Sequence, residues 1–192
     1  MVPTVLYDAC VLYPAPLRDL LMQLALTDMF KARWTDRIHD EWVRSVLANR
    51  PDITVESLAR CRRLMDEHVP DCLVAGYESL VPTLTLPDPD DRHVLAAAIH
   101  GQAELIITFN LSDFPTSVLG QFHIEAVHPD EFIARLWDEQ PAAVLQAARL
   151  HRASLRRPPK TAAEYLATLE QCQLVETVAR LQPHEEENQH HR

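Results

Sequence analysis

Apolar residues along this chain follow two alternating patterns, short continuous runs and longer stripes with helical spacing. The runs at residues 4–7, 32–35, 104–108 and 122–127 are rich in β-branched or aromatic residues, which is typical of strands. Between and after these runs, apolar residues recur at intervals of three and four, which predicts amphipathic helices. The predicted helices cover residues 14–30, 35–47, 54–69, 90–100, 128–136, 141–156 and 161–181.

The order of these elements predicts the fold class. Strands that alternate with helices pair in parallel, because each helix carries the chain back across the sheet. We therefore expect an α/β domain with a parallel sheet over residues 1–137. For residues 138–182 we predict a C-terminal helical extension that is broken at Pro158-Pro159. Its apolar stripe either packs on the domain or forms part of a surface that binds a partner. Residues 183–192 form a polar tail.

The composition indicates which broad class of protein this chain belongs to. With 192 residues, 47% hydrophobic and 24% charged, the chain fits one soluble globular domain with an extension, and three glycines are few for an all-β fold. No apolar stretch reaches the ~18 residues of a membrane span, and no signal peptide is visible, so we expect no membrane contact. Four cysteines without CxxC spacing indicate reduced thiols and a cytoplasmic protein.

Acidic residues follow the predicted strands at positions where ligands bind in α/β proteins. Asp8 ends the first strand, Asp91 stands at the start of helix 90–100, and Asn110 and Asp113 follow the third strand. The carboxyl ends of parallel strands meet at one sheet edge, so these side chains should converge. Gathered carboxylates repel one another unless a cation intervenes, and oxygen ligands suit Mg²⁺ or Mn²⁺.

Two acidic residues also have a plainer structural interpretation, and the position of a third calls for a partner. Asp8 can cap the following helix, and Glu41, beside Asp40, can complement a helix dipole. Asp91 shares the inward stripe of its helix, and a carboxylate there needs a partner. His93 is interpreted either as a substrate contact or as an ordinary surface residue.

Net charge bears on nucleic-acid binding. The formal charge of −10 argues against broad electrostatic attraction to nucleic acid, but a local metal-loaded acidic site can still bind phosphates. The densest basic cluster of the first half, Arg60, Arg62 and Arg63, is either a solvated face or an RNA contact.

Taken in order, four features resemble the PIN-domain ribonucleases of the VapC-like toxin kind. They are the strand before Asp8, Glu41 early in a helix, Asp91 before RHVLAAA, and the ITFNLSDF loop after a strand. The resemblance covers about residues 1–137 and implies an α/β/α sandwich. It further implies Mg²⁺- or Mn²⁺-dependent RNA cleavage, a toxin role and a cognate antitoxin, and a homodimer is compatible with it.

The resemblance also assigns residues. Asp8, Glu41 and Asp91 match the first three acids of the family. At the fourth position Asn110 stands where many members carry aspartate, so we favour Asp113 as the fourth acid. Asn110 then orients a ligand or contacts substrate, and Thr108 hydrogen-bonds a ligand carboxylate.

Three other functions are alternatives to a metal-dependent ribonuclease. An aspartyl phosphatase normally has a second acid two places after the first, but Cys10 stands there. A calcium loop starting at Asp88 fails, because Arg92 and His93 occupy a ligand position and the glycine position. A PIN-like protein that binds RNA or a partner with little turnover remains the alternative, because Asn110 replaces an acid.

Overall fold

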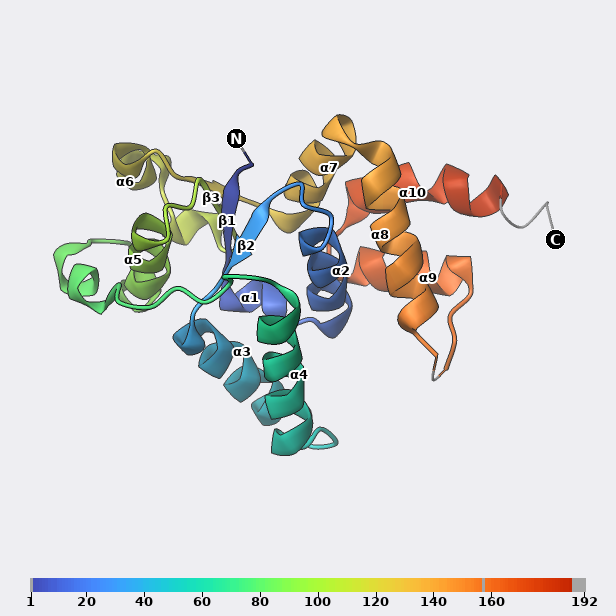
Figure 1. The fold of residues 1–192 in the computed structure, drawn as a ribbon, viewed down its shortest axis with the longest axis horizontal. Coiled ribbons are helices and arrows are strands. Elements are labelled where there is room, and N and C mark those ends of the chain that lie inside the picture. The colour runs from blue at the N-terminus through green and yellow to red at the C-terminus, as the bar shows by residue number, and fades with distance from the viewer. Residues whose placement is uncertain (1, 157, 188–192) are drawn as a thin grey trace.

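A four-stranded parallel sheet lies at the centre of the molecule, in the strand order β2-β1-β3-β4 (Figure 1). The computed structural model describes residues 2–156 and 158–187. The strands are β1 (Thr4–Tyr7), β2 (Lys31–Arg33), β3 (Leu105–Ile107) and β4 (Glu125–Val127). In the register of the sheet, Val5 of β1 lies between Ala32 of β2 and Leu105 of β3. All of these pairings are parallel, which confirms the predicted sheet.

Helices cover the sheet and complete an α/β/α arrangement. The helices are α1 (Ala9–Leu12), α2 (Ala15–Ala25), α3 (Asp36–Asn49), α4 (Val55–His68), α5 (Arg92–His100), α6 (Thr116–Leu119), α7 (Pro129–Glu139), α8 (Pro141–Ser154), α9 (Ala162–Gln171) and α10 (Val175–Glu187), with short 3-10 turns η1 (Glu78–Thr83), η2 (Pro89–Asp91), η3 (Leu111–Asp113) and η4 (Gly120–Phe122). Helix α5 packs against β1 and β3, whereas α2 and the C-terminal helices lie on the other side of the sheet (Figure 1). Because three consecutive alanines of α5 are fully buried, this helix approaches the sheet closely.

Two strands are shorter than predicted, because a residue near each of them adopts a conformation or accepts a hydrogen bond that ends the strand. Strand β2 ends before Thr35, because the Thr35 side chain accepts a hydrogen bond from the Ile38 amide and caps α3. Strand β4 begins only at Glu125, since His123 adopts a left-handed conformation with φ of 58° that cannot continue a strand.

The predicted helix over residues 161–181 was wrong, because the structure has two helices there. Helix α9 ends at Gln171, and α10 starts at Val175 after Gln173, whose φ is 63°. A left-handed residue ends an α-helix and turns the chain. Residues 183–187, the first half of the predicted polar tail, belong to α10, and the rest of that predicted tail lies outside the described residues.

The C-terminal helices are part of the same hydrophobic core as the sheet. Helix α8 packs on α2, and α10 packs on α7 and α9. The Asp130 carboxylate of α7 accepts hydrogen bonds from the Glu176 and Thr177 amides at the start of α10, each 2.9 Å long. Because these amides lack partners inside their own helix, Asp130 caps α10 and ties it to the domain. No helix within the described ranges is long and apolar enough to cross a membrane.

A buried hydrogen-bond network holds α3 in place. The Asp66 carboxylate of α4 accepts hydrogen bonds from the Trp34 indole at 2.8 Å and from His39 at 2.9 Å. The other ring nitrogen of His39 accepts a hydrogen bond from Trp42, so His39 Nε2 carries the hydrogen that it donates to Asp66. Helix α3 is therefore fixed against α4, and it carries Glu41 in a defined position.

Candidate active site

Asp8 lies where β1 ends, and its carboxylate is held from three directions. Its Oδ1 accepts a hydrogen bond from the Ala9 amide at 2.6 Å, and its Oδ2 accepts one from Thr108 Oγ1 at 2.7 Å. The Cys10 thiol donates to the same Oδ2 at 3.1 Å. Asp8 is only 4% exposed, so these contacts set the direction of the carboxylate. The residue caps α1 and also faces the site, and the hydrogen bond predicted for Thr108 is present.

Cys10 is a hydrogen-bond donor and not a reactive thiolate. Burial, followed by the negative charge of Asp8, raises the pKa of the Cys10 thiol to about 12. The protonated thiol also accepts a hydrogen bond from the Phe109 amide at 3.3 Å. Cys10 therefore links the end of β1 to the loop that follows β3.

Glu41 projects from α3 toward the same site and is held by two basic side chains. His93 Nε2 lies 3.0 Å from one Glu41 carboxylate oxygen, and Arg37 Nε lies 3.2 Å from the same atom. Burial alone would raise the pKa of Glu41, but hydrogen bonds and charge from His93 and Arg37 outweigh it and lower that pKa. Glu41 therefore stays ionised.

The expectation that His93 is an ordinary surface residue was wrong. The residue is 1% exposed, and its Nδ1 makes no hydrogen bond within residues 2–156 and 158–187. Its contact is with Glu41, so it supports that carboxylate from behind.

Asp91 lies at the junction of η2 and α5, and its carboxylate does not cap the helix. It occupies the N-cap position of α5, yet its side chain makes no capping hydrogen bond. Asp88 is the acid that caps here, since it accepts a hydrogen bond from the Asp90 amide at 2.8 Å. Burial raises the pKa of Asp91 to about 7, and the charges of the neighbouring carboxylates add to this effect; these are Asp8, Asp88, Asp113 and Glu41.

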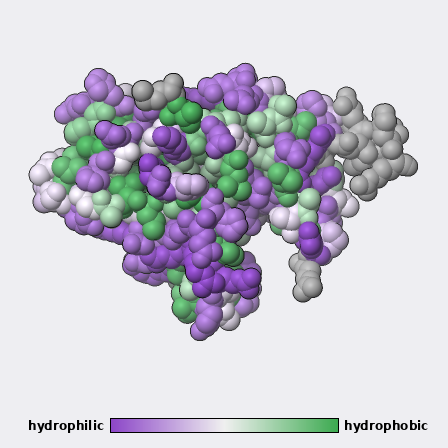
Figure 2. Space-filling view, in the orientation of Figure 1, coloured by the Kyte–Doolittle hydropathy of each residue, from purple (hydrophilic) through white to green (hydrophobic). Residues whose placement is uncertain are grey.

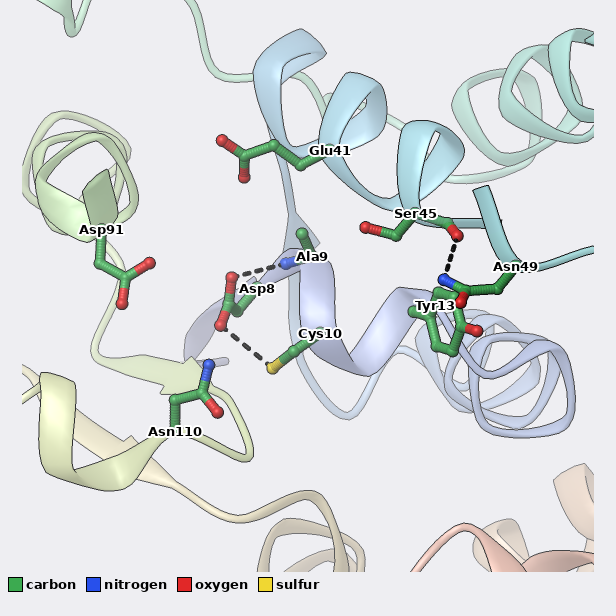
Figure 3. A pocket seen from close by; sticks show the side chains of 9 residues that line it. All are labelled: Asp8, Ala9, Cys10, Tyr13, Glu41, Ser45, Asn49, Asp91 and Asn110. Atoms are coloured by element: carbon green, nitrogen blue, oxygen red, sulfur yellow. Dashed lines mark hydrogen bonds between the residues drawn. The ribbon is translucent and has the colours of Figure 1, made fainter. Parts of the chain in front are cut away.

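A single cleft of about 520 Å³ joins these side chains. Its lining residues are Asp8, Ala9, Cys10, Tyr13, Glu41, Ser45, Asn49, Asp91 and Asn110 (Figure 3). Thr108 lies behind Asp8 and also accepts a hydrogen bond from the Asn110 amide at 3.0 Å. Asp113, in η3, is not part of this lining, and its negative charge acts on Asp91 from nearby.

Besides Ala9, four lining residues of the cleft were not predicted from the sequence: Cys10, Tyr13, Ser45 and Asn49. Ser45 and Asn49 follow Glu41 at intervals of four residues, so they share its face of α3. That spacing was a usable signal for two of the four. Tyr13 and Cys10 carried no comparable signal, because neither α1 nor its contacts could be foreseen.

The donor set of the cleft fits a hard divalent cation. Among the described residues, no three His, Cys, Asp or Glu side chains stand close enough to enclose an ion. Three carboxylates, those of Asp8, Glu41 and Asp91, nevertheless line the cleft together with the neutral amide of Asn110 (Figure 3). Proteins typically bind Mg²⁺ through one or two carboxylates, with water and substrate phosphate completing the shell. Burial first, and then the charges of the neighbouring carboxylates, raise the pKa of Asp91, so a cation in the cleft would relieve this repulsion.

Asp91→Asn should stabilise the protein in the absence of metal, and more so at pH 8 than at pH 5. The raised pKa of Asp91 in the folded state makes wild-type stability fall as pH rises from about 4 to 7, because the folded chain then binds the extra proton. Allowing for solvent screening, the gain at pH 8 is about 1–2 kcal/mol, or roughly 2–8 °C in Tm. Thermal unfolding in chelator at both pH values measures it, with Asp90→Asn as the exposed control. An equal shift at both pH values would contradict the prediction.

An α/β/α fold with an acidic cleft at the carboxyl ends of its strands is the arrangement that the resemblance to PIN-domain proteins implied. The PIN domain family model matches residues 4–112, more than half of the chain, and the chain belongs to this family. The matched region contains all nine lining residues of the cleft, among them Asp8, Glu41, Asp91 and Asn110, and ends one position before Asp113.

The C-terminal helices match a second family model. Residues 129–183 match the model described as "VapC50 C-terminal domain". A protein of Mycobacterium tuberculosis (strain ATCC 25618 / H37Rv) described as "Putative ribonuclease VapC50" is 41% identical over 73 residues. The aligned part is 36% of this chain and 43% of that relative, less than half of its length. No solved structure matches the chain.

Proposed function

We propose that this chain is a Mg²⁺- or Mn²⁺-dependent endoribonuclease that acts as the toxin of a toxin–antitoxin pair. The observation that carries the proposal is that Asp8 and Asp91, from distant segments, open into one cleft with Glu41 and Asn110. Membership of the PIN-domain family and similarity to a protein described as a ribonuclease support it.

In this proposal Asp8 and Asp91 are the residues that hold the cation. Asp8 is already oriented by Thr108 and Cys10, so it needs no rearrangement to bind. Burial raises the pKa of Asp91 to about 7, and its carboxylate would have to be deprotonated to hold a cation. A bound divalent cation polarises the phosphate and lowers the pKa of its water. Glu41 stays ionised and can accept a hydrogen bond from water in the cleft.

Asn110 and Asp113 share the fourth position of the proposed site. Asn110 lines the cleft and offers a neutral oxygen to a metal-bound water or to substrate. Asp113 lies beyond the lining, and we propose that it acts through its charge, which strengthens the attraction of Asp91 for a cation.

RNA digestion in the presence of Mg²⁺, Mn²⁺ or chelator tests the proposed activity directly. We expect cleavage of a single-stranded RNA with either metal and a loss of at least about 100-fold in chelator, because two carboxylates alone only repel the phosphate. Restoring excess metal should restore cleavage. Full activity in chelator would contradict metal dependence, and absence of cleavage with every metal would favour the alternative, a PIN-like binding protein.

The α4 arginine cluster gives that alternative little support. Arg62 hydrogen-bonds Asp36 at 2.5 Å and Asp40 at 2.6 Å, and Arg63 lies 3.5 Å from Glu67. Hydrophilic residues predominate on the surface of α3 and α4, in the lower part of Figure 2. A polyanion gains little from arginines whose charge is already compensated.

A further inference from the structure

The cleft extends well past the acidic residues and changes character along its length. Glu41, Ser45 and Asn49 lie four residues apart on α3 and line the cleft in a row. At 1.5 Å per residue, the row runs about 12 Å along the helix from the carboxylate to the amide. Tyr13, directly after α1, faces Asn49 at the far end from Asp91 (Figure 3).

The far end of the cleft is lined by uncharged side chains, one of them aromatic, that can form hydrogen bonds. Tyr13 is 36% exposed, and Arg50, directly after α3, is close enough to interact with it electrostatically. The Asn49 side-chain amide donates to the Ser45 carbonyl at 2.8 Å, which leaves its oxygen available as an acceptor. The hydroxyl of Ser45 can donate or accept beside it.

We propose that Tyr13, Ser45 and Asn49 form a nucleobase subsite that binds one unpaired base of single-stranded RNA next to the acidic end of the cleft. The inference rests on the proposed ribonuclease function, because the acidic end is where the phosphate would lie. A base is the neutral, flat part of a nucleotide, and exposed aromatic rings bind bases by stacking. Duplex RNA does not present a free base face, so the subsite selects unpaired segments.

Binding of short RNA to Tyr13 variants tests the subsite. The full chain carrying Asp91→Asn, which should not cleave, is titrated with fluorescein-labelled rA8, rC8, rG8 and rU8 in the presence of Mg²⁺. Tyr13→Ala should weaken Kd by about 5- to 100-fold for the tightest octamer, whereas Tyr13→Phe keeps the stacking ring and stays within threefold. Phe122→Ala is the matched control, because Phe122 has the same 36% exposure and lies outside the cleft.

An abasic octamer separates stacking from general damage. The abasic octamer lacks the base that would occupy the subsite. The parent protein should bind it more weakly than the intact octamer, by the same factor by which Tyr13→Ala weakens binding of the intact octamer. Tyr13→Ala should then bind intact and abasic octamers equally, since the two changes remove one shared interaction. Full additivity of the two losses would overturn the subsite, and so would a parent protein that binds no octamer at millimolar concentration. Asn49→Ala should instead change the order of preference among the four octamers.

Cleavage assays distinguish failure of the subsite from failure of the proposed function. If the wild type cleaves RNA and Tyr13→Ala cuts the same positions with unchanged KM, the subsite is wrong and the ribonuclease proposal stands. If the wild type cleaves nothing but octamer affinity depends on Tyr13, the ribonuclease proposal fails. The far end of the cleft is then a single-strand binding site.

Discussion

Asp8→Asn is expected to reduce metal-dependent RNA cleavage by about a thousandfold or more while leaving the fold intact. The exchange removes one of the three carboxylates that line the cleft, one of the two that we propose as metal ligands, and replaces a charged oxygen by an amide nitrogen. Loss of a residue that only supports a metal ligand typically costs ~10–100-fold, so loss of a ligand itself should cost more. Thr108→Val, which removes the hydrogen bond to Asp8, should fall in that smaller range.

Initial rates with saturating Mn²⁺ on one RNA measure the effect, with thermal unfolding of each variant as the check on folding. Asp90→Asn is the matched control, because it makes the same chemical change at an exposed acid outside the cleft lining. It should stay within threefold of the wild type. Activity of Asp8→Asn within tenfold of the wild type would remove Asp8 from the site.

The acidic part of the site could be predicted because strand signals end in acids. The run TVLY stops at Asp8, and in a parallel sheet the end of a strand is also the edge of the sheet. Asp91 followed from helical spacing, since its position places it on the buried side of α5. Both inferences use patterns within ten residues, which local geometry largely determines.

The remaining residues of the cleft depend on contacts that no local pattern carries. His93 is buried against Glu41 of a distant helix, although its position beside polar residues favoured the surface. Cys10 connects to Thr108 and Phe109 across nearly a hundred residues. Such contacts arise from how α1, α3 and the loop after β3 pack together, so a single sequence without those distances cannot predict them.

Some helix boundaries can likewise be predicted from a local sequence pattern, whereas others depend on tertiary packing. Thr54 and Thr161 cap α4 and α9 through their side chains, as the predicted starts at 54 and 161 indicated. The break after Gln171 was missed, because a left-handed glutamine has no strong sequence signature, unlike glycine. The fold class follows from the order of elements, whereas this turn follows from tertiary packing.

Truncation after Trp137 is expected to abolish cooperative folding and not merely to remove an appendage. Helix α8 packs on α2, and the C-terminal helices contribute buried side chains to the common core; these are Val144, Ala147, Ala148, Tyr165, Leu169, Cys172, Leu174 and Leu181. The four largest of them alone are worth ~6–12 kcal/mol of burial, and α2 and α7 would expose comparable apolar surface. That sum matches the ~5–15 kcal/mol stability of an ordinary domain.

The truncated chain should therefore be insoluble, or soluble with no cooperative thermal transition. A chain ending at Glu187 is the control, because it keeps every described helix and should unfold like the full protein. Asp130→Ala provides a graded test, since it leaves the amides of Glu176 and Thr177 uncapped and should lower stability by ~1–3 kcal/mol. If the chain ending at Trp137 unfolded cooperatively at the wild-type Tm and cleaved RNA normally, α8 to α10 would not belong to the core. Their apolar faces would then have to serve a partner, such as the proposed antitoxin.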